Sequence, residues 1–192
     1  KQALGFLSVS DQLRTSAGST VQRLRKLGIK EIGILSGDHE KSVQLVGQKI
    51  GISRLWSGLK PDDKMRIIQE VQRENSKVIF VGDGINDAPA LAVADTGIAM
   101  GGKGTEVALE TADIALMGDD IAKLPFLISL GRRMLLIIKL NIAFGLVFNL
   151  ISVLAGASGL ITPIVGAVIH NVGSVLVVVS SASIGFFKDD SL

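Results

Sequence analysis

Apolar residues along the first part of the chain alternate between short continuous runs and runs with helical spacing. The continuous runs predict buried strands at 4–9, 32–35, 55–56, 78–81, 96–99 and 114–116. Between them, residues 20–27, 41–50 and 64–73 repeat apolar positions every three or four residues, as amphipathic helices do. This alternation predicts an α/β, Rossmann-like domain with a mostly parallel sheet and helices on both faces.

The pattern changes after residue 139. From Leu140 to Phe187 the chain contains no Asp, Glu, Lys or Arg, and His170 is the only ionisable side chain there. A helix that crosses a bilayer needs about 20 predominantly apolar residues. The segment therefore predicts a transmembrane α-helical hairpin, with spans at about 140–158 and 164–187 and an uncharged turn between them.

Charges beside the two spans predict their orientation. Arg132, Arg133 and Lys139 precede the first span and Lys188 follows the second. Positive flanks favour the cytoplasmic side, so both ends of the hairpin and the α/β domain are expected in the cytoplasm. The expected organisation is an α/β domain at 1–120, a stalk at 121–139, the hairpin at 140–187 and a tail at 188–192. We expect this to be the C-terminal portion of a longer integral membrane protein.

Composition excludes several classes of function. The chain has 192 residues with 20 Lys and Arg against 18 Asp and Glu, a net charge of +2, and this small excess does not indicate a nucleic-acid partner. The absence of cysteine excludes a disulfide scaffold and a thiolate metal site within these residues. A single Trp and no Tyr argue against an aromatic platform for stacking bases.

Candidate chemistry gathers where two strands are expected to end, at residues 36–38 and 82–84. Ligands in such sheets bind beyond the carboxyl ends of the strands. Asp83 and Asp87, with Asn86 between them, are the hard oxygen donors that suit Mg²⁺. On composition alone, a plain Gly/Asp turn between a strand and a helix explains this stretch about as well as a magnesium site does. Taken alone, Lys64 is better explained as a solvated position on a helix, and Ser36 is about equally well explained as a simple cap.

Several ordered motifs resemble those of P-type ATPases, in the haloacid dehalogenase superfamily of phosphotransferases. VGDGINDAPAL at 81–91 resembles their hinge motif, and KPDDK at 60–64 resembles their proline-x-x-lysine segment. ILSGDH at 34–39 resembles their threonine-glycine-aspartate motif, with Ser36 in place of threonine. Further matches at 95–101, 105–108 and 112–114 extend the resemblance over nearly the whole chain.

The resemblance implies roles for single residues in phosphoryl transfer. Asp83 would coordinate Mg²⁺ at the phosphorylation site together with Asp87, and Asn86 and Asp87 would complete the hydrogen-bond network. Lys64 would neutralise charge on the transferring phosphoryl group, as such reactions require.

The loop at 36–38 receives a second set of implied roles. The Ser36 hydroxyl and the Gly37 N–H would bind phosphoryl oxygens, and Asp38 would support the loop. The aspartate that is phosphorylated in this family is not among these residues. ATP would be bound mainly by upstream domains, and these residues alone are expected to be inactive.

In this chain two expected spans follow the α/β domain. This resembles the heavy-metal branch of these pumps, in which two final helices follow the catalytic domain. Polar side chains inside a membrane usually face a bundle interior. His170, Asn171, Ser174, Asn149 and Asn141 are therefore candidate ligands for a transition-metal cation, with helix–helix contact through small and polar residues as the alternative. Imidazole, amide and hydroxyl ligands favour Zn²⁺, Co²⁺, Ni²⁺ or Mn²⁺ over Cu⁺, which prefers sulfur.

The sequence thus predicts part of an ATP-driven transporter that forms an aspartyl-phosphate intermediate and exports a divalent metal. Its partners would be the metal cargo, membrane lipid and upstream domains of the same polypeptide, in a bacterial plasma membrane. The alternatives are a soluble or degenerate haloacid dehalogenase-type phosphatase, or a non-catalytic fragment of such a pump. A soluble phosphatase would not explain residues 140–187.

Overall fold

A computed structural model describes residues 13–74, 76–82, 85–101, 110–118 and 120–188. The chain divides into two units, Lys1–Pro125 and Phe126–Leu192, and each is described by itself. The strand expected at 4–9 lies outside the described residues.

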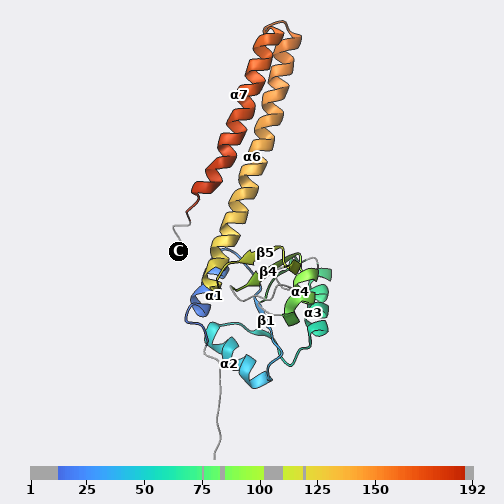
Figure 1. Cartoon of the computed structure of the whole chain (residues 1–192), viewed down its shortest axis with the longest axis vertical. Helices are drawn as coiled ribbons and strands as arrows, with labels where there is room; N and C mark the ends of the chain where they lie inside the picture. The colour runs from blue at the N-terminus through green and yellow to red at the C-terminus, as the bar shows by residue number, and fades with distance from the viewer. Residues whose placement is uncertain (1–12, 75, 83–84, 102–109, 119, 189–192) are drawn as a thin grey trace, which may run out of the picture. The chain divides into compact units, whose positions relative to one another are not determined.

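The first unit alternates helices and parallel strands, which confirms the predicted α/β fold (Figure 1). Within the described residues, β1 pairs with β2, and β4 lies between β3 and β5, every pair being parallel. The elements are α1 (Ala17–Lys26), β1 (Gly33–Leu35), α2 (Glu40–Ile50), β2 (Arg54–Trp56), α3 (Pro61–Arg73), β3 (Ile79–Gly82), η1 (Ile85–Asp87), α4 (Ala88–Val93), β4 (Thr96–Met100), β5 (Ile114–Leu116) and η2 (Ile121–Lys123).

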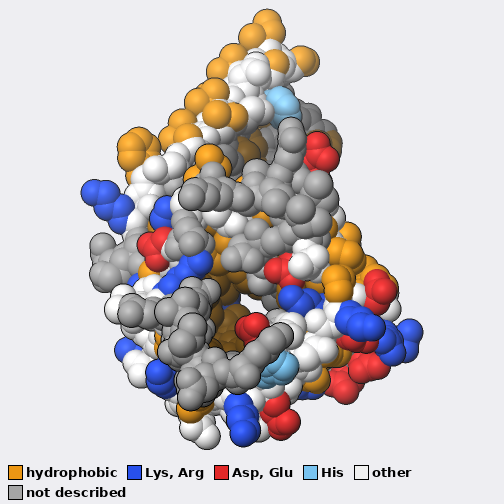
Figure 2. All heavy atoms as spheres, turned by 60° about the horizontal axis from the view of Figure 1, so that its bottom comes forward, with side chains coloured by type: hydrophobic (Ala, Val, Ile, Leu, Met, Phe, Trp, Pro, Cys, Tyr) orange, Lys and Arg blue, Asp and Glu red, His pale blue; other side chains and the backbone are white. Residues whose placement is uncertain are grey.

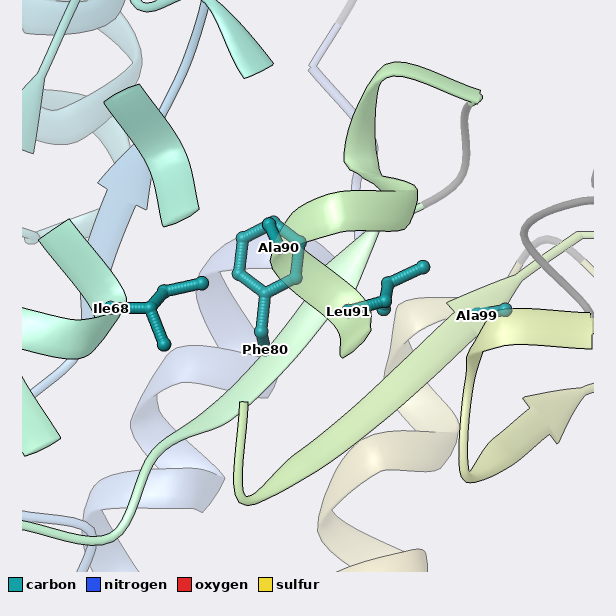
Figure 3. Packing of buried hydrophobic residues seen from close by; sticks show 5 residues of the cluster. All are labelled: Ile68, Phe80, Ala90, Leu91 and Ala99. Carbon is teal, nitrogen blue, oxygen red and sulfur yellow. The ribbon is translucent and has the colours of Figure 1, made fainter. Parts of the chain in front are cut away.

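Side chains from two helices and two strands build the core of this unit. Ile68 of α3, Ala90 and Leu91 of α4, Phe80 of β3 and Ala99 of β4 pack together, each at most 8% exposed (Figure 3). Helix α4 lies very close to β4, because a methyl group on Gly97 would lie only 2.5 Å from the Leu91 carbonyl oxygen. Burial of this cluster fixes α3 and α4 against the sheet.

Helix α3 turns one face toward the core along its whole length. It begins with Pro61 in its first turn, and the Asp63 carboxylate accepts a 3.0 Å hydrogen bond from the N–H of Lys60 just before the helix. Because Ile68 is buried, Lys64 one turn earlier and Gln72 one turn later lie on the same inward face. This places the Lys64 amine near the carboxyl end of β3.

Two long helices follow, α6 (Leu124–Ala157) and α7 (Pro163–Ala182), with a final 3₁₀ turn η3 (Ser183–Phe186). Within the described residues, both are long and apolar enough to cross a membrane. Hydrophobic side chains dominate the visible part of the helical pair (Figure 2). Helix α6 continues without a break through Arg132, Arg133 and Lys139, because basic residues are compatible with a helix. The limits of the membrane spans stay a prediction.

Small and polar residues line the contact between α6 and α7. Gly173 is buried, and a methyl group there would lie 2.5 Å from Phe148 Cε1. Nearer the other end of the pair, the Asn141 amide donates a 2.9 Å hydrogen bond to the Ser181 hydroxyl. Small residues of this kind allow apolar helices to approach closely.

The turn between the two helices is short and internally hydrogen-bonded. Gly159 adopts a left-handed conformation with φ of 75°. The N–H of Leu160 donates to the Ala155 carbonyl at 3.0 Å, as in a common helix-ending motif. Thr162 then caps α7 by accepting a hydrogen bond from the N–H of Val165 at 3.4 Å.

Candidate functional site

The loop after β1 is held in one conformation by its own side chains. The Ser36 hydroxyl donates a 2.9 Å hydrogen bond to Asp38 Oδ2, and the Asp38 N–H donates to the Ser36 oxygen at 3.1 Å. Gly37, between these two residues, is exposed. The loop thus directs a hydroxyl, a carboxylate and a backbone N–H to the carboxyl end of β1.

Backbone hydrogen bonds tie this loop to the segment that leads into α3. The N–H of Leu59 donates to the Ser36 carbonyl at 3.0 Å, and the N–H of Gly58 donates to the Asp38 carbonyl at 2.8 Å. Gly58 has φ of 64°, a conformation that favours glycine. Since Lys60 directly precedes α3, the loop after β1 and the first turn of α3 form one connected edge.

Lys64 and Asp87 form an ion pair at this edge, with 2.6 Å between Lys64 Nζ and Asp87 Oδ1. Each side chain is only 13% exposed. Lys64 comes from the inward face of α3, and Asp87 ends the η1 turn that follows β3. Partial burial keeps water from screening the two charges, so this pair is stronger than a surface ion pair.

Of the other residues predicted around this site, the structure describes Asn86 but not Asp83. Asn86 is exposed, beside the partly buried Asp87. Asp83, the predicted first magnesium ligand, lies outside the described residues. The described part of the chain contains no group of three or more His, Asp or Glu side chains that could hold a metal ion by themselves. Mg²⁺ is commonly held by one or two carboxylates with waters and a substrate phosphate, so the donor set at 83 and 87 fits it.

Asp95 supports the opposite end of α3, and the sequence did not single it out for this role. Its carboxylate accepts hydrogen bonds from Lys77 Nζ at 2.6 Å, Gln72 Nε2 at 2.9 Å and the Val78 N–H at 3.1 Å. The hydrogen bond from Lys77, followed by those from Gln72 and Val78, lowers the pKa of Asp95 from 3.8 to about 2. Gln72 also donates to the Val93 carbonyl at 3.0 Å. Helix α3 is thus fastened by polar contacts one turn before and one turn after Ile68.

In the helical unit the candidate ligands divide into separate contacts. His170 Nδ1 lies 3.3 Å from Asn149 Oδ1, which brings these two predicted residues together across α6 and α7. Asn171 donates instead to the Ala167 carbonyl at 3.0 Å, and Ser174 donates to the His170 carbonyl at 3.1 Å. Asn141 is bonded to Ser181, so it is not part of the His170 contact. Among the predicted side chains, His170 and Asn149 are the pair that the structure joins.

Comparison with known proteins adds independent information on this arrangement. Residues 1–95 match a family model described as a haloacid dehalogenase-like hydrolase. A probable cadmium-transporting ATPase of Listeria monocytogenes is 45% identical over 178 residues, which cover 93% of this chain and 25% of that protein. A manganese-exporting P-type ATPase of Mycobacterium tuberculosis strain H37Rv is 41% identical over 187 residues, or 97% of this chain and 26% of that protein.

A solved structure extends the similarity to both units. The crystal structure of a zinc-transporting PIB-type ATPase in the E2·Pi state matches 91% of this chain and 28% of that chain, with a TM-score of 0.82 and 32% sequence identity. The chain therefore spans about a quarter of the length of the relatives that it matches. These likenesses agree with the resemblance that the sequence motifs indicated.

Proposed function

This chain is related to the metal-transporting P-type ATPases, and we propose that it forms part of an ATP-driven pump that exports a divalent transition-metal cation. The observation that carries the proposal is the partly buried Lys64–Asp87 ion pair, at the same edge as the Ser36 loop, in a chain with two long apolar helices. A soluble phosphatase would use the first feature but has no need of the second. The protein is accordingly an integral membrane protein, and we place the α/β unit in the cytoplasm and the pump in a bacterial plasma membrane.

The proposed chemistry at the edge is transfer of a phosphoryl group between ATP and an aspartate outside this chain. Lys64 would neutralise charge that develops on the phosphoryl oxygens, while Asp87 holds its amine in place. The Ser36 hydroxyl and the Gly37 N–H would bind the same oxygens. Asp38, which accepts the Ser36 hydrogen bond, would orient that hydroxyl. Mg²⁺ held by Asp83 and Asp87 would supply further positive charge when bound.

The proposed cargo contact is the His170–Asn149 pair within the helices. A neutral imidazole is a frequent ligand for transition metals, and an amide oxygen supplies a second donor of the type that borderline divalent ions accept. The 3.3 Å separation of His170 Nδ1 and Asn149 Oδ1 supports this choice, because it joins two donor side chains across α6 and α7. Asn171 and Ser174 instead donate hydrogen bonds to backbone carbonyls of their own helix, and Asn141 donates to Ser181.

The test uses the full-length protein that carries this chain, in isolated membranes, with His170→Ala as the variant. We expect ATP hydrolysis stimulated by Zn²⁺ or Mn²⁺ to fall at least about 10-fold, because a metal ligand is lost. Phosphorylation by inorganic phosphate without metal should persist, since this backward reaction needs only the cytoplasmic site.

Asn171→Ala is the matched control, because its amide is bonded within its own helix, and it should retain more of the stimulation. Unchanged stimulation in the His170 variant would assign the histidine to packing. If the unaltered protein forms no phosphoenzyme at all, the proposed pump function is wrong.

A further inference from the structure

Gly82 is the last residue of β3, where it is buried and lies opposite Ala99 of β4. Its φ lies outside the left-handed region that favours glycine. The backbone at this position would therefore accept an ordinary residue. The requirement for glycine has to come from the space around it.

That space is filled by the side chain of Asp87. A methyl group on Gly82 would lie 2.7 Å from Asp87 Cβ, 2.9 Å from Cγ and 2.8 Å from Oδ2. Contacts below about 3 Å between such atoms do not occur in folded proteins without a shift. Because the nearest atom is Asp87 Cβ, rotation of the Asp87 side chain cannot relieve the clash. The η1 turn itself would have to move away from β3.

The opposite side of the same carboxylate is occupied by Lys64. Asp87 Oδ1 accepts the 2.6 Å hydrogen bond from Lys64 Nζ, while Oδ2 is the oxygen that faces Gly82. The carboxylate is therefore enclosed between the backbone of β3 and the amine from α3. Movement of η1 by even a fraction of an ångström would alter the distance between Lys64 and Asp87.

We propose that Gly82 is a positioning residue, whose missing side chain sets the place of the Asp87 carboxylate against Lys64. The geometric part of this inference stands on the structure alone, and its consequence for phosphoryl transfer rests on the proposed function. Gly82 acts through Asp87 and does not itself have to touch a phosphoryl group.

The geometric part is tested by a double-mutant cycle on the full chain in detergent, with variants Gly82→Ala, Asp87→Gly and both together. Glycine at 87 removes the Cβ that the new methyl group would meet, whereas alanine would keep it. Urea unfolding is followed by the fluorescence of Trp56, the only tryptophan of this chain. We expect Gly82→Ala to lower the unfolding midpoint when Asp87 is present and to have little effect when residue 87 is glycine.

Gly18→Ala is the matched control, because Gly18 lies in α1 with no atom within 4 Å of the added methyl group. It should leave the unfolding midpoint unchanged or raise it. If Gly82→Ala is too unstable to purify, recovery of folded protein in the double variant supports the inference. Failure of both, or an equal penalty in both backgrounds, overturns it.

The functional part uses the full-length protein and measures phosphoenzyme formation from ATP. We expect Gly82→Ala to slow phosphorylation on the order of 100-fold with little change in the apparent KM for ATP, because the displaced pair acts on the transition state. A normal rate in Gly82→Ala would refute the positioning role. Absence of phosphoenzyme in the unaltered protein would instead refute the proposed function and leave the result of the unfolding cycle intact.

Discussion

Replacing Lys64 with methionine should destabilise the α/β unit, because the Asp87 carboxylate would lose its ion pair with the Lys64 amine. Both side chains are 13% exposed, and their charged atoms are 2.6 Å apart. Removing one partner of a buried ion pair costs about 3–5 kcal/mol, and the remaining exposure places this pair near the lower value, about 3 kcal/mol. That change corresponds to a shift of roughly 100-fold in the folding equilibrium.

The double variant Lys64→Met/Asp87→Asn separates loss of the ion pair from burial of the Asp87 charge without the Lys64 amine. Replacing both partners with neutral groups of similar shape is often close to neutral, so we expect the double variant to lie within about 1 kcal/mol of the unaltered protein. It should therefore be more stable than Lys64→Met by roughly 2 kcal/mol. Phosphorylation should not recover with stability, because the positive charge at the edge is still missing.

Urea unfolding of the full chain in detergent, read by Trp56 fluorescence, measures these differences. Trp56 lies in β2, in the same unit as the ion pair. With a urea slope of about 2 kcal/mol/M, Lys64→Met should lower the midpoint by roughly 1.5 M. If the single variant loses less than about 1 kcal/mol and the double variant gains nothing over it, the two charges are not coupled by burial.

Two further predictions concern helix contacts and acid stability. Gly173→Ala should disrupt the helical pair and lower metal-stimulated ATP hydrolysis, because the new methyl group would lie 2.5 Å from Phe148. Gly166→Ala should be tolerated, because the nearest atom to its methyl group would be 3.7 Å away. Equal activity of the two variants would contradict this prediction. The pKa of Asp95 is lowered from 3.8 to about 2, so the stability that its carboxylate contributes is present above pH 3.8 and is lost as the pH falls toward 2. The difference in stability between the unaltered protein and Asp95→Asn, measured by Trp56 fluorescence, should therefore shrink across that range, and a constant difference would refute the assignment.

The local pattern of the sequence was sufficient to find most elements of the α/β unit. The strand predicted at 78–81 is β3 at Ile79–Gly82, and the helix predicted at 64–73 is α3 at Pro61–Arg73. These agree because buried strands and amphipathic helices leave different apolar periods along the chain. The first turn of α6 was not anticipated at Leu124, because a change in charge marks where a chain meets lipid and does not mark where a helix begins.

Contacts between distant segments were the part that the sequence could not supply. Lys64 and Asp87 were each singled out, but nothing in their spacing indicated that they bond to one another. Helix geometry also gives residues that are adjacent in sequence different partners. His170 lies against Asn149, while Asn171, about 100° further round α7, bonds to the carbonyl one turn before it. Asp95 lies directly before a predicted strand, where a carboxylate can accept hydrogen bonds from exposed backbone N–H groups. This position is the sequence signal that could have indicated its supporting role.

The turn between α6 and α7 bears on how the protein is made. At Ser158–Thr162 it carries no charged side chain, and the N–H groups of Ser158, Gly159 and Leu160 already bond to carbonyls of α6. Moving a charged residue to the centre of a bilayer costs about 2.5–3.5 kcal/mol during insertion, and each unsatisfied backbone group adds to the cost. A tip that has no charged side chain, and in which these three N–H groups are already bonded, can pass through the membrane together with both helices. We therefore expect the pair to enter the bilayer as one hairpin during synthesis, with the flanking arginines and lysines retained on the side of the ribosome.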